Sequence, residues 1–114
     1  MQECLFCRIA RGEVPCRKIY EDDELFAFYD IAPQAPVHFL VIPKRHIASL
    51  MEFGADEVPL AGRMVLKAQE LARSLGCSEK GARFVFNCKT DGGQTVDHVH
   101  LHVLGGRRMA WPPG

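Results

Sequence analysis

The chain has 114 residues with 14 basic and 14 acidic side chains, so its formal net charge is zero at pH 7. This length is typical of one domain, and we expect residues 1–114 to form a single domain. Balanced charge disfavours a nucleic-acid partner, which needs a basic surface, and the lack of a run of about 18 apolar residues disfavours a membrane span.

The predicted elements begin with a short helix over about residues 5–11, which Gly12 ends. Two strands over residues 18–21 and 25–29 follow, joined by an acidic turn. The next segment, residues 37–42, is a nearly continuous apolar run and is predicted to be a third strand. The first half of the chain is therefore expected to form neighbouring strands preceded by one short helix.

The longest helix is predicted over residues 56–75. Its apolar side chains recur at helical spacing, at Ala61, Met64, Val65, Ala68, Leu71, Ala72 and Leu75. Gly76 is a natural residue just past the helix end. Strands over residues 83–88 and 99–104 complete the chain. Hairpins around one long helix predict an α+β fold with a mostly antiparallel, five-stranded meander sheet.

Three histidines alternate with apolar residues in the last predicted strand, at His98, His100 and His102. Side chains alternate across a strand, so the three imidazoles share one face. Such a row can bind a metal, attack an electrophile through one imidazole, or lie on a solvated sheet face. Three histidines in register, directly after a glycine-containing loop, favour a functional site over the solvated face.

That loop, Asp91-Gly-Gly-Gln-Thr95, is a candidate anion cradle. Gly92 and Gly93 allow close approach of the main chain to a ligand, consecutive backbone N–H groups can hold an anion, and Thr95 adds a hydroxyl donor. A glycine pair alone usually indicates a tight hairpin. Its place before the histidines predicts a phosphate or carboxylate site.

The segment from Gly92 to Gly106 resembles the His-x-His-x-His-x-x signature of the histidine triad (HIT) superfamily. Residues 30–46 and the ending Trp111-Pro-Pro-Gly114 are similar to its Hint branch, the purine nucleoside phosphoramidases, in their bacterial form. The resemblance covers nearly the whole chain in order. It implies a HIT-like fold, a homodimer, and a C-terminal tail, residues 105–114, that reaches the partner subunit's active site.

The resemblance implies hydrolysis of the P–N bond of purine nucleoside 5′-phosphoramidates, such as AMP-lysine-like or aminoacyl-AMP substrates. His100 matches the nucleophile that forms a nucleotidyl-histidine intermediate, which water then opens. His102 matches the residue that hydrogen-bonds the phosphate, and His38 and His98 match further histidines of the same network. A neutral imidazole is a good nucleophile toward phosphorus. No cofactor is required for catalysis if hydrogen-bond donors surround the phosphate.

The resemblance also implies which residues bind the nucleotide. Asp30 matches the carboxylate that binds the ribose hydroxyls, since a diol favours a bidentate acceptor. Asn87, the Gly93 backbone and Thr95 match contacts to the phosphate region, and Trp111 matches the tail residue that shapes selectivity for the leaving amine. The apolar walls of the base pocket match Leu5, Phe6, Ile9, Phe28, Tyr29 and Ile31.

Cys4-Leu-Phe-Cys7 is a Cys-x-x-Cys pair, which alone is ambiguous between zinc and redox chemistry. Some HIT relatives bind zinc with two such cysteines and two histidines, matched here by His46 and His98. With all four ligands present, the site would be structural rather than catalytic. The alternative is that both cysteines are ordinary helix residues.

The cellular compartment is predicted from the cysteines and the start of the chain. Five cysteines are an odd number and do not suggest a complete disulfide framework. The polar, acidic start Met1-Gln-Glu-Cys4 lacks the basic and apolar segments of a secretion signal. We therefore expect a cytoplasmic protein.

Other functions stay open at this point. One is a dinucleoside polyphosphate hydrolase or nucleotidyltransferase of a sister HIT branch, which the Trp111–Gly114 ending and His102 disfavour. Another is a nucleotide-binding regulatory module with vestigial hydrolysis, and a third uses the histidine pair for a catalytic zinc. Two residues depart from the pattern of close relatives: Asp97 replaces an aromatic residue, and Ala110 replaces a longer polar one.

Overall fold

The computed structural model describes residues 4–114. The start Met1–Glu3, on which the expectation of no secretion signal partly depends, lies outside the described residues. Two short 3-10 turns, η1 and η2, precede the long helix α2. The elements in chain order are α1 (Leu5–Ala10), β1 (Lys18–Glu21), β2 (Leu25–Tyr29), β3 (Val37–Pro43), η1 (Leu50–Glu52), η2 (Ala55–Glu57), α2 (Val58–Ser74), β4 (Ala82–Phe86), α3 (Lys89–Gly92) and β5 (Leu101–Gly105).

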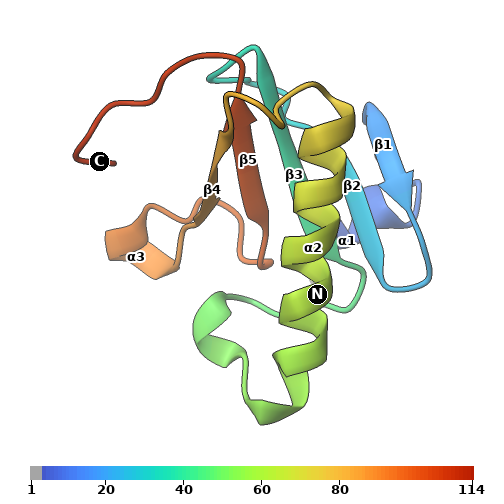
Figure 1. Ribbon diagram of the computed structural model, residues 1–114. Coiled ribbons are helices and arrows are strands. Elements are labelled where there is room, and N and C mark those ends of the chain that lie inside the picture. Colours follow the sequence, from blue (N-terminus) through green and yellow to red (C-terminus); the bar gives the residue numbers. More distant parts are fainter. Residues whose placement is uncertain (1–3) are drawn as a thin grey trace.

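The five strands form one antiparallel sheet in the order β1-β2-β3-β5-β4. The predicted α+β fold is confirmed, but the meander extends only through β1, β2 and β3. After α2 the chain enters the far edge of the sheet as β4 and returns as β5 between β3 and β4 (Figure 1). Sequence order does not say where a strand inserts after a long connection. The insertion makes β5, which carries His102, a central strand.

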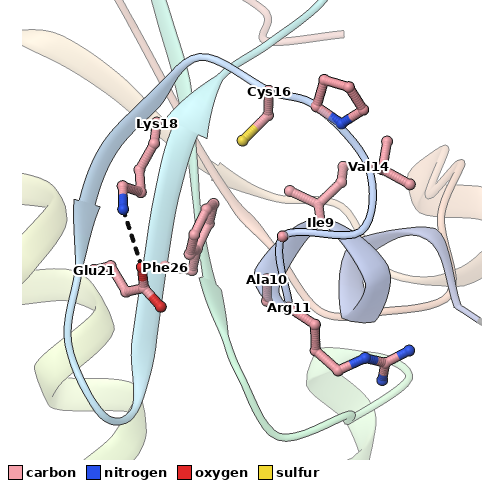
Figure 2. Close-up of a pocket in the computed structure, with 10 residues that line it drawn as sticks. Ile9, Ala10, Arg11, Val14, Cys16, Lys18, Glu21 and Phe26 are labelled. Atoms are coloured by element: carbon pink, nitrogen blue, oxygen red, sulfur yellow. Dashed lines mark hydrogen bonds and ion pairs between the residues drawn. The ribbon is translucent and has the colours of Figure 1, made fainter.

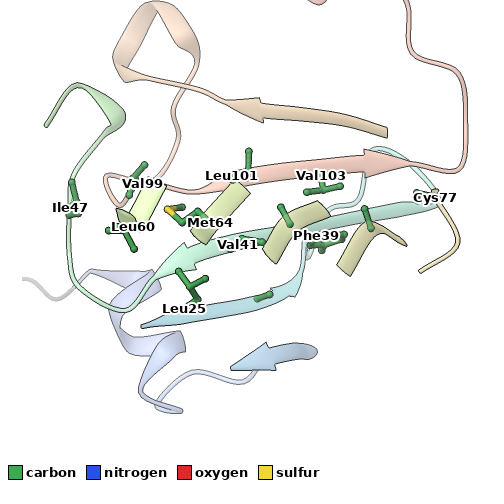
Figure 3. Packing of buried hydrophobic residues seen from close by; sticks show 13 residues of the cluster. Leu25, Phe39, Val41, Ile47, Leu60, Met64, Cys77, Val99, Leu101 and Val103 are labelled. Atoms are coloured by element: carbon green, nitrogen blue, oxygen red, sulfur yellow. The ribbon is translucent and has the colours of Figure 1, made fainter. Parts of the chain in front are cut away.

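Side-chain alternation gives the sheet two apolar faces. One packs under α2, where Met64 and Ala68 are fully buried against Phe39, Val41 and Val103 (Figure 3). The other face is covered by α1 (Figure 1), and its cluster consists of Phe6, Ile9, Phe26, Phe28, Leu40 and Ile42. Burial of each large side chain contributes about 1.5–3 kcal/mol. The predicted histidine site lies on the α1 side, because His38 and His102 alternate with residues that face α2.

The long helix starts two residues later than predicted. Residues 55–57 form the 3-10 turn η2, and α2 begins at Val58 with a proline in its first turn, where the missing N–H costs no hydrogen bond. At the other end, Gly76 has a φ of +92°. Its N–H donates to the Arg73 carbonyl at 3.1 Å, and the Cys77 N–H donates to the Ala72 carbonyl at 2.9 Å. The predicted role of Gly76 is confirmed by this Schellman-type end.

The last strand is shorter than predicted, because β5 starts at Leu101 rather than at Val99. Continuation of the β3–β5 register would place Val99 opposite Pro43, which has no N–H to donate. Val99 instead donates to the Ile47 carbonyl at 2.7 Å. His98 and His100 therefore lie in the segment that leads into the strand, and only His102 lies within it.

Beyond β5 the chain leaves the sheet and runs past β4 to the C-terminus (Figure 1). The Arg83 guanidinium donates to the Ala110 carbonyl at 2.8 Å, and the Trp111 side chain is 83% exposed. Within the described range 4–114, no helix is long and apolar enough to cross a membrane.

Candidate functional site

His100 is the buried centre of the site. Its Nδ1 lies 2.7 Å from the His98 carbonyl oxygen. A carbonyl oxygen only accepts, so this bond assigns the proton to Nδ1 and leaves the lone pair of Nε2 free. Burial lowers the pKa of His100, which keeps the ring neutral near pH 7. The edge-to-face Phe6 ring, 5.1 Å away between centroids, packs against it. This arrangement supplies a neutral nucleophilic nitrogen.

His38 and His102 form a second pair, joined between Nε2 of His38 and Nδ1 of His102 at 3.0 Å. The Gln34 backbone N–H donates to His38 Nδ1 at 3.0 Å. Because that nitrogen accepts, neutral His38 carries its proton on Nε2 and donates to His102. His102 then carries its own proton on Nε2. Burial, followed by the neighbouring His100 and His38, lowers the pKa of His102 to about 4.

Asp30, directly after β2, lies beside this pair. Its Oδ2 is 3.4 Å from His38 Nε2 and 4.0 Å from His102 Nδ1. Its Oδ1 accepts the Ala32 N–H at 2.8 Å. Asp30 is thus fixed by its own turn, with its other oxygen directed toward the histidines. The structure brings together the carboxylate predicted for ribose binding and the histidines predicted for catalysis, whose individual roles stay predictions.

The predicted base-pocket residues separate into two groups. Phe6, Ile9 and Phe28 are buried in one cluster on the α1 side, and the Phe6 and Phe28 rings meet edge to face at 5.5 Å. Leu5 and Ile31 are apolar but exposed, at 46% and 101%, and their part in a base pocket stays a prediction.

Tyr29 does not join this pocket through its side chain. It packs against the cluster under α2, on the opposite face of the sheet from Phe28, and the Arg17 guanidinium lies 4.6 Å from its ring centroid. Successive strand residues alternate between faces, so Phe28 and Tyr29 cannot both line one pocket from a regular strand. The prediction for the Tyr29 side chain is wrong.

The loop before the histidines contains a short helix, α3, that sequence patterning did not predict. Gly93 follows it with a φ of +78°, a conformation that favours glycine. Gln94, which sequence reasoning missed, braces the loop: its Oε1 accepts the Lys89 N–H at 2.8 Å, and its Nε2 donates to the Ala48 and Val96 carbonyls at 2.7 and 2.9 Å. The loop is therefore not a simple tight hairpin.

The predicted phosphate contacts lie around this loop. The β4–β5 register pairs Phe86 with Leu101, so its continuation places Asn87 opposite His100. Thr95 is exposed in the connection between α3 and the histidines. Asn87 thus lies opposite His100 in the register, Thr95 precedes the histidines along the chain, and their contacts to a phosphate stay predictions.

Cys4, Cys7, His46 and His98 converge at one point. His98 Nδ1 lies 3.3 Å from Cys4 Sγ, 3.6 Å from Cys7 Sγ and 3.3 Å from His46 Nδ1, and Cys7 Sγ lies 3.5 Å from His46 Nδ1. Tetrahedral Zn²⁺, bonded at about 2.3 Å to sulfur and about 2.0–2.1 Å to nitrogen, separates sulfur and nitrogen ligands by about 3.5 Å and two nitrogens by about 3.3 Å. The donor set and its spacing fit zinc.

His98 is oriented for this second role. Its Nε2 lies 2.8 Å from the Pro43 carbonyl, so Nε2 carries the proton and Nδ1 presents a lone pair to the two sulfurs. The buried side chain thus belongs to the possible metal centre, whereas its backbone carbonyl orients His100. His98 connects the two sites through different atoms.

A separate cavity of about 300 Å³ lies beside α1 and the β1–β2 hairpin (Figure 2). Its lining includes the Cys16 thiol, Phe26 and the Lys18–Glu21 ion pair at 3.1 Å. Ile9 is the single predicted site residue among those that line it. This cavity is therefore separate from the histidine cluster.

Comparison with known proteins agrees with the geometry. The HIT domain family model matches residues 11–109. The chain belongs to the HIT family. A HIT-like protein of Synechococcus elongatus is 50% identical over 113 residues, which cover 99% of this chain and 98% of that protein.

Solved structures of HIT proteins have the same fold. A HIT family hydrolase from Legionella pneumophila has a TM-score of 0.97 and 51% identity, with 98% of this chain and 100% of that chain covered. A histidine triad nucleotide-binding protein from Candida albicans has a TM-score of 0.82 and 31% identity, with 96% and 83% covered. The HIT family and its α+β fold, predicted from the sequence, are confirmed.

Proposed function

We propose that this HIT protein hydrolyses the P–N bond of purine nucleoside 5′-phosphoramidates, releasing a nucleoside monophosphate and an amine. The observation that carries the proposal is the hydrogen bond from His100 Nδ1 to the His98 carbonyl. It leaves Nε2 unprotonated, and the His38–His102 pair beside it presents an N–H donor. A nucleophile and a donor next to each other suit attack on a phosphoryl group.

In the proposed reaction, His100 Nε2 attacks phosphorus while the P–N bond breaks, and the amine nitrogen takes a proton from solvent as it leaves. The His98 carbonyl accepts a hydrogen bond from the cationic imidazole of the intermediate. His102 Nε2–H donates to a phosphoryl oxygen and stabilises the developing negative charge. Water then opens the nucleotidyl-histidine bond, releasing the nucleoside monophosphate and the neutral imidazole.

The rest of the nucleotide would occupy the α1 side of the site. Asp30 would bind the ribose hydroxyls through the carboxylate oxygen that faces His38. Phe6, Ile9 and Phe28 would pack against the base, and Leu5 and Ile31 would be covered by it. The solved Candida albicans relative is described as nucleotide-binding and the Legionella pneumophila relative as a hydrolase, which supports a nucleotide substrate.

The test compares hydrolysis of an adenosine 5′-phosphoramidate with a reporter amine by the native protein and by His100→Ala. The proposal expects AMP release that falls by at least about a thousandfold in the variant. Hydrolysis unaffected by the substitution would contradict the assignment of the nucleophile. Tight AMP binding without turnover in the native protein would favour a regulatory module instead, and faster cleavage of a dinucleoside polyphosphate would favour the sister branch.

We also propose that Cys4, Cys7, His46 and His98 hold a structural zinc. When bound, the metal would tie α1 to the segment after β3 and fix the His98 backbone. Metal analysis of untagged protein is expected to give about one zinc per chain, retained in Cys16→Ser and lost in Cys7→Ser. Equal metal content in the two variants would contradict the assignment.

A homodimer is the expected assembly. β4 is an edge strand, which proteins usually cover, and the large apolar side chains of Val65, Leu66 and Phe84 are exposed on α2 and β4. The exposed tail with Trp111 leaves the sheet on the β4 side (Figure 1), as a tail that reaches a partner would. Light scattering tests this assembly. The native protein is expected to be a dimer and Phe84→Glu a monomer.

We propose a cytoplasmic location, because the proposed zinc site depends on reduced cysteines. Thiol ligands must stay reduced to bind a metal, and the cytoplasm is a reducing compartment that keeps them so.

A further inference from the structure

The turn between β2 and β3, residues 30–36, is braced from within. The Asp30 carboxylate accepts the Ala32 N–H at 2.8 Å, and the Gln34 side-chain amide donates to the Ala32 carbonyl at 2.9 Å. The turn closes where the Asp30 N–H donates to the His38 carbonyl at 3.0 Å. These bonds place the Gln34 backbone N–H against the imidazole of buried His38.

The segment that follows β5 holds the same turn from outside. Arg107 Nε donates to the Gln34 carbonyl at 3.0 Å. Gly106, at a φ of +87°, packs so closely that an added Cβ would lie 2.8 Å from Pro36 Cβ. Two neighbouring residues of the C-terminal segment therefore contact this turn, Arg107 at Gln34 and Gly106 at Pro36, although they are some 70 positions away along the chain.

The Gln34 N–H decides the direction of a chain of hydrogen bonds. It donates to His38 Nδ1, so His38 donates from Nε2 to His102 Nδ1, and His102 is left with its proton on Nε2. The opposite tautomer of His38 would set its Nδ1–H against the Gln34 N–H. That would leave the His38 Nδ1–H without an acceptor, which is costly in a buried network, and would reverse the His38–His102 bond, with His102 donating from Nδ1.

We propose that Gln34 and Arg107 are positioning residues: the Gln34 backbone amide sets His102 as a hydrogen-bond donor, and Arg107 holds that amide in place. The proposal rests on the proposed function in one respect, since the Nε2–H of His102 is the group that would meet the phosphate. It also explains why a second cluster would not bind a metal, although its ligand atoms are spaced as in a metal site. Asp30, His38 and His102 present ligand atoms within 4.8 Å of one another, but a proton on His38 Nε2 removes the lone pair that a metal would need.

The first test is the tautomeric state of the histidines in the native protein without substrate. Imidazole ¹⁵N labelling with long-range ¹H–¹⁵N correlation spectra distinguishes a proton on Nδ1 from one on Nε2. The proposal expects His38 and His102 both protonated on Nε2 at neutral pH. A proton on Nδ1 of His38 or of His102 would overturn it, and this measurement needs no variant.

The second test compares Arg107→Ala with Arg108→Ala, an exposed neighbour with the same charge. Arg107→Ala is expected to show a second His102 tautomer and a loss of turnover of about threefold to tenfold, the size of one lost hydrogen bond. Arg108→Ala is expected to match the native protein, and Arg107→Lys, which retains one donor, to recover part of both effects. Turnover that falls while the tautomer is unchanged, or identical behaviour of the two alanine variants, would overturn the proposal.

The tautomer measurement also separates this inference from the proposed function. If the native protein hydrolyses no phosphoramidate but Arg107→Ala still changes the His102 tautomer, the positioning role stands and the substrate assignment fails. If hydrolysis depends on His100 but the spectra of Arg107→Ala are native, the function stands and the positioning role fails.

Discussion

Two histidine clusters lie at the two sides of His100, and backbone groups give them opposite chemistry. At the first, the Pro43 carbonyl accepts a hydrogen bond from His98 Nε2–H, which leaves the Nδ1 lone pair facing Cys4 and Cys7. At the second, the Gln34 N–H occupies the lone pair of His38 and leaves a proton facing His102. When one ring nitrogen donates to a carbonyl, the other has a lone pair for a metal. When one ring nitrogen accepts from an amide N–H, the other carries a proton and donates.

Among the substitutions that distinguish the two clusters, His38→Gln is expected to have the largest effect on turnover. The glutamine amide can turn either its N–H or its oxygen toward His102 Nδ1, so His102 is no longer held in one tautomer. We expect turnover of the phosphoramidate to fall by about 10- to 100-fold while zinc content is unchanged. Steady-state kinetics and metal analysis on the same preparation measure both, and loss of zinc from this variant would show that the clusters are not independent.

His46→Gln is the matched change in the other cluster. It removes one of four metal ligands while leaving His98 and its carbonyl in place. We expect zinc to be lost and the melting temperature to fall by roughly 10 °C, as for a loss of about 2 kcal/mol in a domain of this size. Turnover by the folded protein at 25 °C should change by less than about threefold, in contrast to His38→Gln. A collapse of turnover without unfolding would favour a catalytic metal.

Acid should destabilise the fold through His102. Its pKa of about 4 in the fold lies below its ordinary value of about 6.5, so the unfolded chain binds the proton more readily. Stability is then complete above pH 6.5 and falls as the pH drops toward 4, by up to about 3 kcal/mol for this group. Urea unfolding of the native protein and His102→Gln from pH 7.5 to 4 should give a shallower pH dependence in the variant. Parallel curves would contradict the burial argument.

The smallest expected effect is that of Asp97→Tyr, at the position where the resemblance to the family implies an aromatic residue. Asp97 is exposed in the segment before His98, and an exposed carboxylate is well screened by water. We expect the turnover rate to change by less than about twofold across its pH profile. A shift of the acid limb of the pH–rate profile by a full unit would instead place the Asp97 charge close to the reacting histidines.

The periodic parts of the fold were predictable from the sequence. The apolar spacing of α2 predicts its start to within two residues, and Gly76 marks its end. Alternation along the last strand places Val99, Leu101 and Val103 in the core. The position of β5 between β3 and β4 was not predictable, because a long connection does not encode which edge of the sheet the next strand joins.

In the site, residue identity was easier to predict than residue orientation. The histidine row and the cysteine pair were visible as patterns, and the resemblance to the HIT family supplied Asp30, His38 and His46, whose chemistry is carried by their side chains. Tyr29 was misplaced because the base pocket was matched by position rather than by strand face. Gln34 was missed because it acts through its backbone N–H. Gln94 and Arg107 were missed because their side chains bond to main-chain groups of turns, and such contacts leave no pattern in the sequence.

The most direct test of the account is to trap the covalent intermediate. The native protein is mixed with an adenosine 5′-phosphoramidate, quenched within one turnover, and digested for mass spectrometry under neutral conditions that preserve phosphohistidine. The account predicts an adenylate adduct on His100, absent from His100→Ala and present at similar initial level in His46→Gln. Turnover with no adduct on any histidine, or an adduct on His102 or His38, would contradict the central claim that the His98 carbonyl prepares His100 as the nucleophile.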